Sequence, residues 1–239
     1  MKRVVVTGMG LVTPFGCGKS HNWNSLISTK SGATKITKFD STKYKCQVAC
    51  EVMIGNGENG TFNAEDWIER KEIKKIDDFI KYAMAAGEEA FIESNIGSIN
   101  DPQSFRAGCI IGSGMGGLPG IEQTSIDYAN GKKISPFFIT GRIINMPAGY
   151  LSIKYNLKGP NYSTVSACAS SAHAIGESYR LIQHGQVDVM MTGGSEATIS
   201  PIGIEGFAAC RALSTKFNDC LLYTSDAADE RSSVDLGGR

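Results

Sequence analysis

The 239-residue sequence has neither a net charge nor a long apolar run. Lysine plus arginine and aspartate plus glutamate both number 24, so no overall charge draws the chain to nucleic acid or to an anionic membrane. Glycines or charges interrupt every apolar stretch well before the roughly 18 residues that a membrane span needs. The apolar run near the N-terminus is too short for a signal peptide. With 41% hydrophobic residues, these absences predict a globular, cytoplasmic protein.

The cysteines do not follow the pattern of a disulfide framework. They are odd in number and scattered through apolar contexts, which predicts reduced thiols, most of them inert. No internal repeat of short, fixed period is present. The seven cysteines are Cys17, Cys46, Cys50, Cys109, Cys168, Cys210 and Cys220.

Apolar residues that recur in runs or at helical spacing predict alternating strands and helices. The three consecutive valines within residues 2–7 indicate a strand buried on both faces. Residues 35–56 show no clear period. Alternation of this kind is typical of a layered α/β fold with a largely parallel sheet. The predicted strands are residues 2–7, 107–111, 162–165 and 187–192, and the predicted helices are residues 20–27, 74–94, 143–155 and 169–184.

The last twenty residues break this pattern, because they are polar and have no apolar periodicity. They resemble translated sequencing-adapter sequence. We therefore expect a truncated domain over residues 1–219 and a non-native or disordered tail over residues 220–239. A natural disordered C-terminus is the alternative.

Three glycine motifs suggest nucleotide binding. After Gly8 and Gly10, the third glycine of a dinucleotide fingerprint is replaced by Thr13, and the segment at Gly18 lacks the first glycine of a phosphate loop. The GSGMGG run at residues 112–117 satisfies the fingerprint, but no acidic strand end follows about 20 residues later to hold a ribose. We interpret this run as a tight strand exit where the backbone approaches another element. We expect no cofactor and no metal ion.

Cys168 differs from the other cysteines in its setting. A predicted strand delivers it to the start of a predicted helix, and small residues follow it. The positive end of a helix favours a thiolate over a thiol, small neighbours leave room for an acyl group, and the backbone N–H of Cys168 could face an oxyanion. Burial in the core is the ordinary alternative for a cysteine. It suits Cys109 and Cys210 better than Cys168.

Several segments resemble those of the β-ketoacyl-acyl carrier protein synthases, which have the thiolase-like fold. The type-II, long-chain-elongating branch is the closest match, and the resemblance covers about residues 1–219. The segments, in family order, are VVVTGMGLVTPFG at 4–16, GSGMGG at 112–117, KISPFFI at 133–139, NMPAG at 145–149, TVSACASSAHAIG at 164–176, and GGSEA with GFAACRALS within 193–214.

The resemblance implies the N-terminal half of a layered α/β/α fold with a mostly parallel, mixed sheet. It also implies that Cys168 accepts an acyl group from acyl carrier protein, and that malonyl-acyl carrier protein then loses carbon dioxide and condenses with the thioester. Met115, Phe138 and Phe207 resemble the lining of the acyl pocket, with Phe138 reaching across a homodimer interface. Ordinary core positions would look the same. Residues similar to those that dock the acidic carrier protein are Lys71, Lys74, Lys75, Lys132, Lys133 and Arg211, and a solvated basic face is the alternative.

Histidine is scarce, with only His21, His173 and His184. His173 follows Cys168 by five residues, a helical spacing that turns its side chain away from the nucleophile, so we interpret it as structural. The resemblance places two catalytic histidines, a lysine and a gating phenylalanine in a second half that these residues do not contain. We therefore expect this chain alone not to condense, and to dissolve poorly because half of a core is missing. A non-catalytic carrier-protein-binding or dimerising partner and a thiolase-like coenzyme A enzyme are the alternatives.

Overall fold

The computed structural model describes residues 2–216, 218 and 219. Within these residues the chain forms two compact units, one made of residues 2–29 and 52–198 and the other of residues 30–51 and the described residues from 199 on. The tail predicted for residues 220–239 lies outside the described residues.

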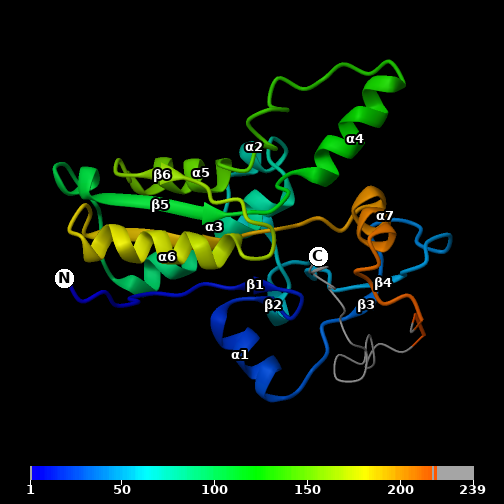
Figure 1. Cartoon of the computed structure of the whole chain (residues 1–239), viewed down its shortest axis with the longest axis horizontal. Helices are drawn as coiled ribbons and strands as arrows, with labels where there is room; N and C mark the ends of the chain where they lie inside the picture. Colours follow the sequence, from blue (N-terminus) through cyan, green and yellow to red (C-terminus); the bar gives the residue numbers. More distant parts are fainter. Residues whose placement is uncertain (1, 217, 220–239) are drawn as a thin grey trace, which may run out of the picture. The chain divides into compact units, whose positions relative to one another are not determined.

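A three-stranded parallel sheet forms the centre of the first unit (Figure 1). Its middle strand is β5 (Ala107–Gly112), flanked by β6 (Asn161–Tyr162) and β7 (Val189–Gly194). All six residues of β5 are buried, because their small or apolar side chains are covered on both faces. The prediction of a parallel sheet is confirmed. β6 is shorter than the predicted strand, and β7 begins two residues later.

Helices cover both faces of this sheet. Ala107, Cys109 and Ile111 pack in one cluster with Phe79 of α3 (Asp78–Ser94) and with Leu151 of α5 (Met146–Tyr155). On the opposite face, the backbone of Gly112 lies against α6 (Ser170–Gln183). The predicted layered α/β/α fold is confirmed.

The predicted helices all form, with shifted ends. α1 (Lys19–Ile27) and α6 match the prediction within a residue or two. The helix predicted from residue 74 begins later, as α3 at Asp78, because the side chain of Asp77 accepts the N–H of Asp78 and caps α3 there. Pro147 lies in the first turn of α5, where it displaces no helical hydrogen bond.

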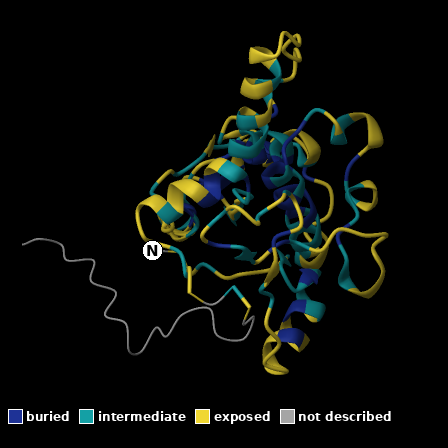
Figure 2. Ribbon diagram, turned by 90° about the vertical axis from the view of Figure 1, so that its right-hand side faces the viewer, coloured by how far each residue is buried: buried dark blue, intermediate teal, exposed yellow. Residues whose placement is uncertain are grey.

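Three helices of the described residues were not predicted: the short α2 (Arg70–Ile73), α4 (Leu118–Ala129) and α7 (Pro201–Ala209). α4 projects from the first unit and has no buried residue; in Figure 2 it is the helix at the top, coloured yellow and teal for exposed and intermediate residues. α7 belongs to the second unit, where Ile204 packs with Ile36 and Cys46. The remaining elements are β1 (Val12–Thr13), β2 (Gly16–Cys17), β3 (Thr34–Lys35), β4 (Val48–Ala49), η1 (Glu58–Gly60), η2 (Ala64–Asp66) and η3 (Gln103–Arg106), with β1 antiparallel to β2 and β3 antiparallel to β4.

The prediction of a buried strand over residues 2–7 is wrong. In the described part of the chain these residues join no strand, and Val5 and Val6 are 58% and 79% exposed. Instead of pairing with β7, residues 4–11 line an apolar cavity of about 580 Å³ together with α3, α6 and β7. A run of three valines forms a buried strand only when a neighbouring strand pairs with its backbone N–H and C=O groups. Among the described residues, no strand does so.

Candidate active site at the start of helix α6

The site is built on a sharp bend between β6 and α6. Ala167 has a positive φ of 52°, which turns the chain just before Cys168. The hydroxyl of Ser170 accepts the N–H of Ser166 at 2.9 Å and donates to the carbonyl of Ala167 at 2.7 Å. Since α6 begins at Ser170, these bonds fix the bend to the first turn of the helix.

Cys168 is a free, exposed thiol on this bend, two residues before α6. Its setting contrasts with that of Cys109 in β5, where burial raises the pKa of the thiol to about 12. Burial, with a smaller effect of Glu89, also raises the pKa of Cys17 to about 11. The prediction of a buried, structural Cys210 is wrong, because Cys210 is exposed at the end of α7. Exposure alone therefore does not distinguish Cys168; its place before a helix does.

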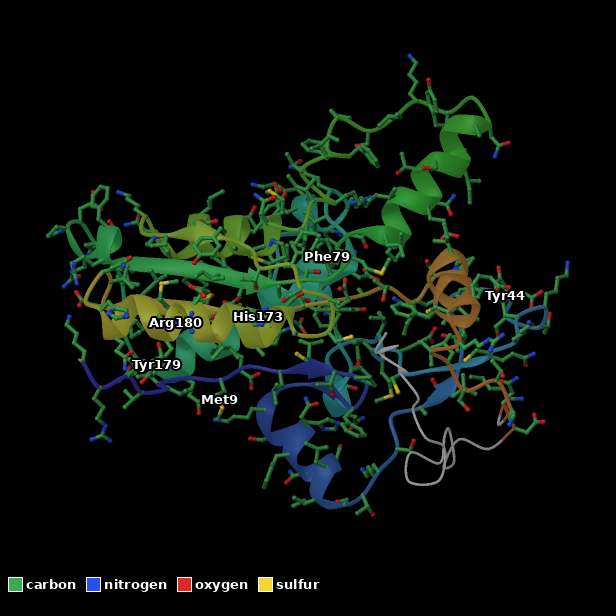
Figure 3. The ribbon with its side chains drawn as sticks, viewed as in Figure 1. Met9, Tyr44, Phe79, His173, Tyr179 and Arg180 are labelled. Carbon is green, nitrogen blue, oxygen red and sulfur yellow. The ribbon has the colours of Figure 1, made fainter. Side chains whose placement is uncertain are left out.

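A serine and a histidine flank Cys168. The hydroxyl of Ser166 lies 2.6 Å from Nδ1 of His173, which is exposed near the first turn of α6 (Figure 3). This bond joins the residue before the bend to the helix after it. The contact agrees with a structural role for His173, although sequence reasoning did not identify Ser166 as its partner.

The glycine run at residues 112–117 packs directly against the bend. A side chain on Gly112 would place its Cβ 2.4 Å from the carbonyl oxygen of Ser170, and one on Gly114 would lie 3.6 Å from Cα of Ala167. The N–H of Ser113 donates to the carbonyl of Thr164 at 3.3 Å. The interpretation of this run as a tight strand exit with a close backbone approach is confirmed.

Glu196, just after β7, was missed as a residue of this site. Its carboxylate accepts the N–H groups of Gly114 at 2.7 Å, Met115 at 2.9 Å and Gly116 at 3.1 Å, and the hydroxyl of Ser113 at 3.2 Å. A nucleotide pyrophosphate would need these same N–H groups. The glycine run therefore holds a carboxylate of its own chain, which argues against a dinucleotide site. The sequence signal for Glu196 was its place in the GGSEA segment, but that segment did not indicate what its carboxylate binds.

The three residues predicted to line an acyl pocket are not buried. Met115 is 44% exposed on the glycine run, and Phe138 is half-buried in the segment after α4. Phe207 is 41% exposed on α7 of the second unit. The structure brings Met115 to the bend of Cys168, through the packing of Gly114 against Ala167.

The predicted carrier-protein-binding residues lie on three segments. Lys71 is on α2, and Lys74 and Lys75 follow it; Lys75 lies 4.7 Å from the ring centre of Phe137. Lys132 and Lys133 are exposed after α4, and Arg211 is exposed after α7 in the second unit. Three of the lysines carry acidic partners in ion pairs of 2.7 to 2.8 Å: Lys71 with Glu69, Lys75 with Glu72 and Lys132 with Asp127.

Solved ketosynthases share this fold. A β-ketoacyl synthase from Burkholderia phymatum superposes with a TM-score of 0.77 at 26% identity, over 92% of this chain and 52% of that one. The ishigamide ketosynthase/chain length factor superposes with a TM-score of 0.76 at 22% identity, over 87% and 51%.

The chain belongs to the β-ketoacyl synthase family. Residues 1–231 match the family model described as "Beta-ketoacyl synthase, N-terminal domain", which confirms the resemblance. The 3-oxoacyl-[acyl-carrier-protein] synthase 2 of Rhizobium meliloti is 47% identical over 92% of this chain and 52% of its own length, and that of Coxiella burnetii is 44% identical over 90% and 50%. The chain spans about half the length of the curated relatives it matches.

Two features are absent from the described residues. None of the helices there combines the length and hydropathy that a bilayer span requires. Within the same residues, no group of three or more histidine, cysteine, aspartate or glutamate side chains is placed to hold a metal ion.

Proposed function

We propose that this chain carries the acyl-accepting half of a β-ketoacyl-acyl carrier protein synthase of fatty acid synthesis, with Cys168 as the nucleophile. The observation that carries the proposal is the exposed thiol of Cys168 on a rigid bend before α6. The names of the relatives supply the reaction class, a 3-oxoacyl synthase that works on acyl carrier protein.

The reaction has two steps. The thiolate of Cys168 attacks the thioester carbonyl of an acyl-carrier protein, the carrier thiol leaves, and the acyl chain remains on Cys168 as a thioester. The malonyl group of a second carrier protein then loses carbon dioxide. Its carbanion attacks the thioester on Cys168, which releases the thiolate and forms a β-ketoacyl chain on the carrier protein.

The start of α6 supports the first step. The positive end of the helix dipole faces the bend, so it favours the oxyanion that forms during acyl transfer. The second step needs groups that stabilise the enolate oxygen. Nε2 of His21 contacts the carbonyl of Phe15 at 2.9 Å, and Nδ1 of His173 contacts the hydroxyl of Ser166. Both imidazole rings are therefore engaged in other contacts. We expect this chain to accept an acyl group without condensing it.

Acyl carrier protein is the proposed partner. Lys71, Lys74, Lys75, Lys132, Lys133 and Arg211 are the proposed contacts with its acidic surface. Three of these lysines already pair with local acids, so docking has to exchange those local pairs for pairs with the carrier protein.

A homodimer is proposed for the complete synthase. α4 and the segment that follows it expose several apolar side chains, among them Tyr128 at 65% and Ile139 at 59%. A monomer gains nothing from presenting such a segment to water, whereas an interface would bury it. Phe138 lies within this segment, in agreement with its proposed place across the interface.

A reducing compartment fits the thiols. Six cysteines in the described residues are free, and Cys50, Cys168 and Cys210 among them are exposed. On this ground we propose a cytoplasmic location.

A non-catalytic partner that only binds the carrier protein is the rival function. The exposed thiol at the bend argues against it, because such a partner has no use for a reactive cysteine. The test compares two reactions of the 239-residue chain: transfer of a labelled acyl group from acyl-carrier protein, and release of carbon dioxide from malonyl-carrier protein. Acyl transfer without decarboxylation is expected. Carrier-protein binding with no acyl transfer would establish the rival.

A further inference from the structure

The carboxylate of Glu196 contacts four consecutive positions of the glycine run, residues 113–116. Its position follows from the sheet: Gly194 pairs with Gly112, and the N–H of the next residue, Ser195, donates to the carbonyl of Gly112 at 3.0 Å. Glu196 lies two residues beyond the end of β7, so its carboxylate reaches the loop that follows the neighbouring strand, β5.

The contacts form an anion site made of backbone. Successive N–H groups from Gly114, Met115 and Gly116 converge on the carboxylate, in the manner of the concave backbone sites that bind anions. Hydrogen bonds to an ionised acceptor are stronger than those to a neutral one. Without Glu196, three N–H groups that point to one place would lose their common acceptor.

The loop held by Glu196 touches the bend of Cys168. A Cβ on Gly114 would lie 3.0 Å from Oε2 of Glu196 on one side and 3.5 Å from the carbonyl oxygen of Ala167 on the other. Met115 is the next residue along. A shift of the loop would therefore move Met115 relative to the bend.

We propose that Glu196 is a positioning residue, which fixes residues 113–116 against the bend of Cys168 and so sets the approach of an acyl chain to that thiol. This inference rests on the proposed function, because only an acyl-accepting Cys168 gives the loop an acyl chain to guide. Glu196 itself does not touch the reacting atoms in this role.

The test uses Glu196→Gln and Glu196→Ala in the 239-residue chain. Glu177→Gln is the matched control, since Glu177 is a glutamate of α6 that pairs only locally with Arg180 at 3.3 Å. The first measurement is hydrogen–deuterium exchange. The amides of Gly114 and Met115 are expected to exchange about tenfold faster in both Glu196 variants and unchanged in the control, because they lose charge-assisted bonds, whereas the N–H of Gly116 keeps the hydroxyl of Ser113 at 3.2 Å. Exchange in β5 must stay slow, which separates a freed loop from an unfolded chain.

The second measurement is the rate at which Cys168 reacts with a dodecyl chloroacetamide, divided by its rate with iodoacetamide. We expect this ratio to fall about fivefold or more in the Glu196 variants, since a loose loop obstructs the long probe more than the small one. Unchanged exchange, or faster exchange with an unchanged ratio, would overturn the proposal. If the unaltered chain shows no preference for the long probe while exchange responds as expected, the proposed function fails and the fixing of the loop by Glu196 stands.

Discussion

At the scale of single residues, the site depends on how a few polar groups shape the bend around Cys168. Ser166, Ser170 and Ala167 bond within one turn of chain, and His173 reaches back from the helix. None of these bonds involves the thiol sulfur. The chain thus positions Cys168 through its neighbours and leaves the thiol itself exposed.

The bond between Ser166 and His173 predicts a coupled effect on stability. Ser166→Ala and His173→Ala should each lower the free energy of unfolding by about 0.5 to 1.5 kcal/mol, and the double variant by little more than either one, because both remove the same bond. Urea unfolding of the four proteins measures this. Strictly additive losses would show that the two side chains act independently.

At the scale of elements, the junction of β5 with α6 is the tightest contact near the site. Gly112→Ala should destabilise the chain by about 1 to 3 kcal/mol, because its Cβ would meet the carbonyl oxygen of Ser170 at 2.4 Å. Gly176→Ala is the matched control. Gly176 lies inside α6 with nothing within 4 Å of the added Cβ, so this change should stabilise by about 0.5 to 1 kcal/mol. Thermal unfolding distinguishes the two, and equal effects would contradict the packing described.

Salt bridges link the N-terminal segment to Asp188, the residue directly before β7. The carboxylate of Asp188 accepts hydrogen bonds from Nη2 of Arg106 and Nζ of Lys2, each at 2.9 Å. Arg106, with a smaller effect of Lys2, holds the pKa of Asp188 well below its usual range.

Because the folded pKa of Asp188 lies below the unfolded one, its contribution to stability is present above about pH 4 and is lost as the pH falls further. The melting temperature should therefore fall progressively as the pH drops below about 4, and Asp188→Asn should make this fall smaller while lowering the melting temperature at pH 7. The same pH dependence in both proteins would refute the role of Asp188.

The sequence predicted elements well where their signal was local. Six buried residues in β5 and the apolar period of α3 stand out without knowledge of neighbours. α4 escaped prediction because it buries nothing and so has no apolar face toward a core. The valines of residues 2–7 misled because their burial depends on a partner strand that the described residues do not supply.

Cys168 was predictable from its place in a motif, whereas Glu196 acts through four contacts about 80 residues away in sequence, which no local pattern encodes.

At the scale of the whole molecule, the first unit leaves apolar surface uncovered. The cavity of about 580 Å³ between residues 4–11, α3, α6 and β7 includes Ile175, which is 51% exposed. Uncovered apolar surface of this kind promotes association and binds hydrophobic dyes.

We therefore expect the folded chain to bind 8-anilinonaphthalene-1-sulfonate and to aggregate at moderate concentration. Ile175→Lys should lower the dye fluorescence by about half, because it places a charge in the cavity. Ile153→Lys is the control, since Ile153 is 79% exposed on α5 and does not line the cavity. An equal loss in both variants would mean that the dye binds elsewhere.

The central claim is that Cys168 is the acyl acceptor, and covalent trapping tests it most directly. The folded chain is treated with an acyl chloroacetamide or cerulenin at pH 8, and the modified cysteines are located by peptide mass spectrometry in the unaltered chain, in Cys168→Ala and in Cys210→Ala. We predict modification at Cys168 in the unaltered chain and in Cys210→Ala, and none at Cys109, whose thiol is buried and has a pKa of about 12. Equal total modification of Cys168→Ala and the unaltered chain would contradict the assignment of Cys168.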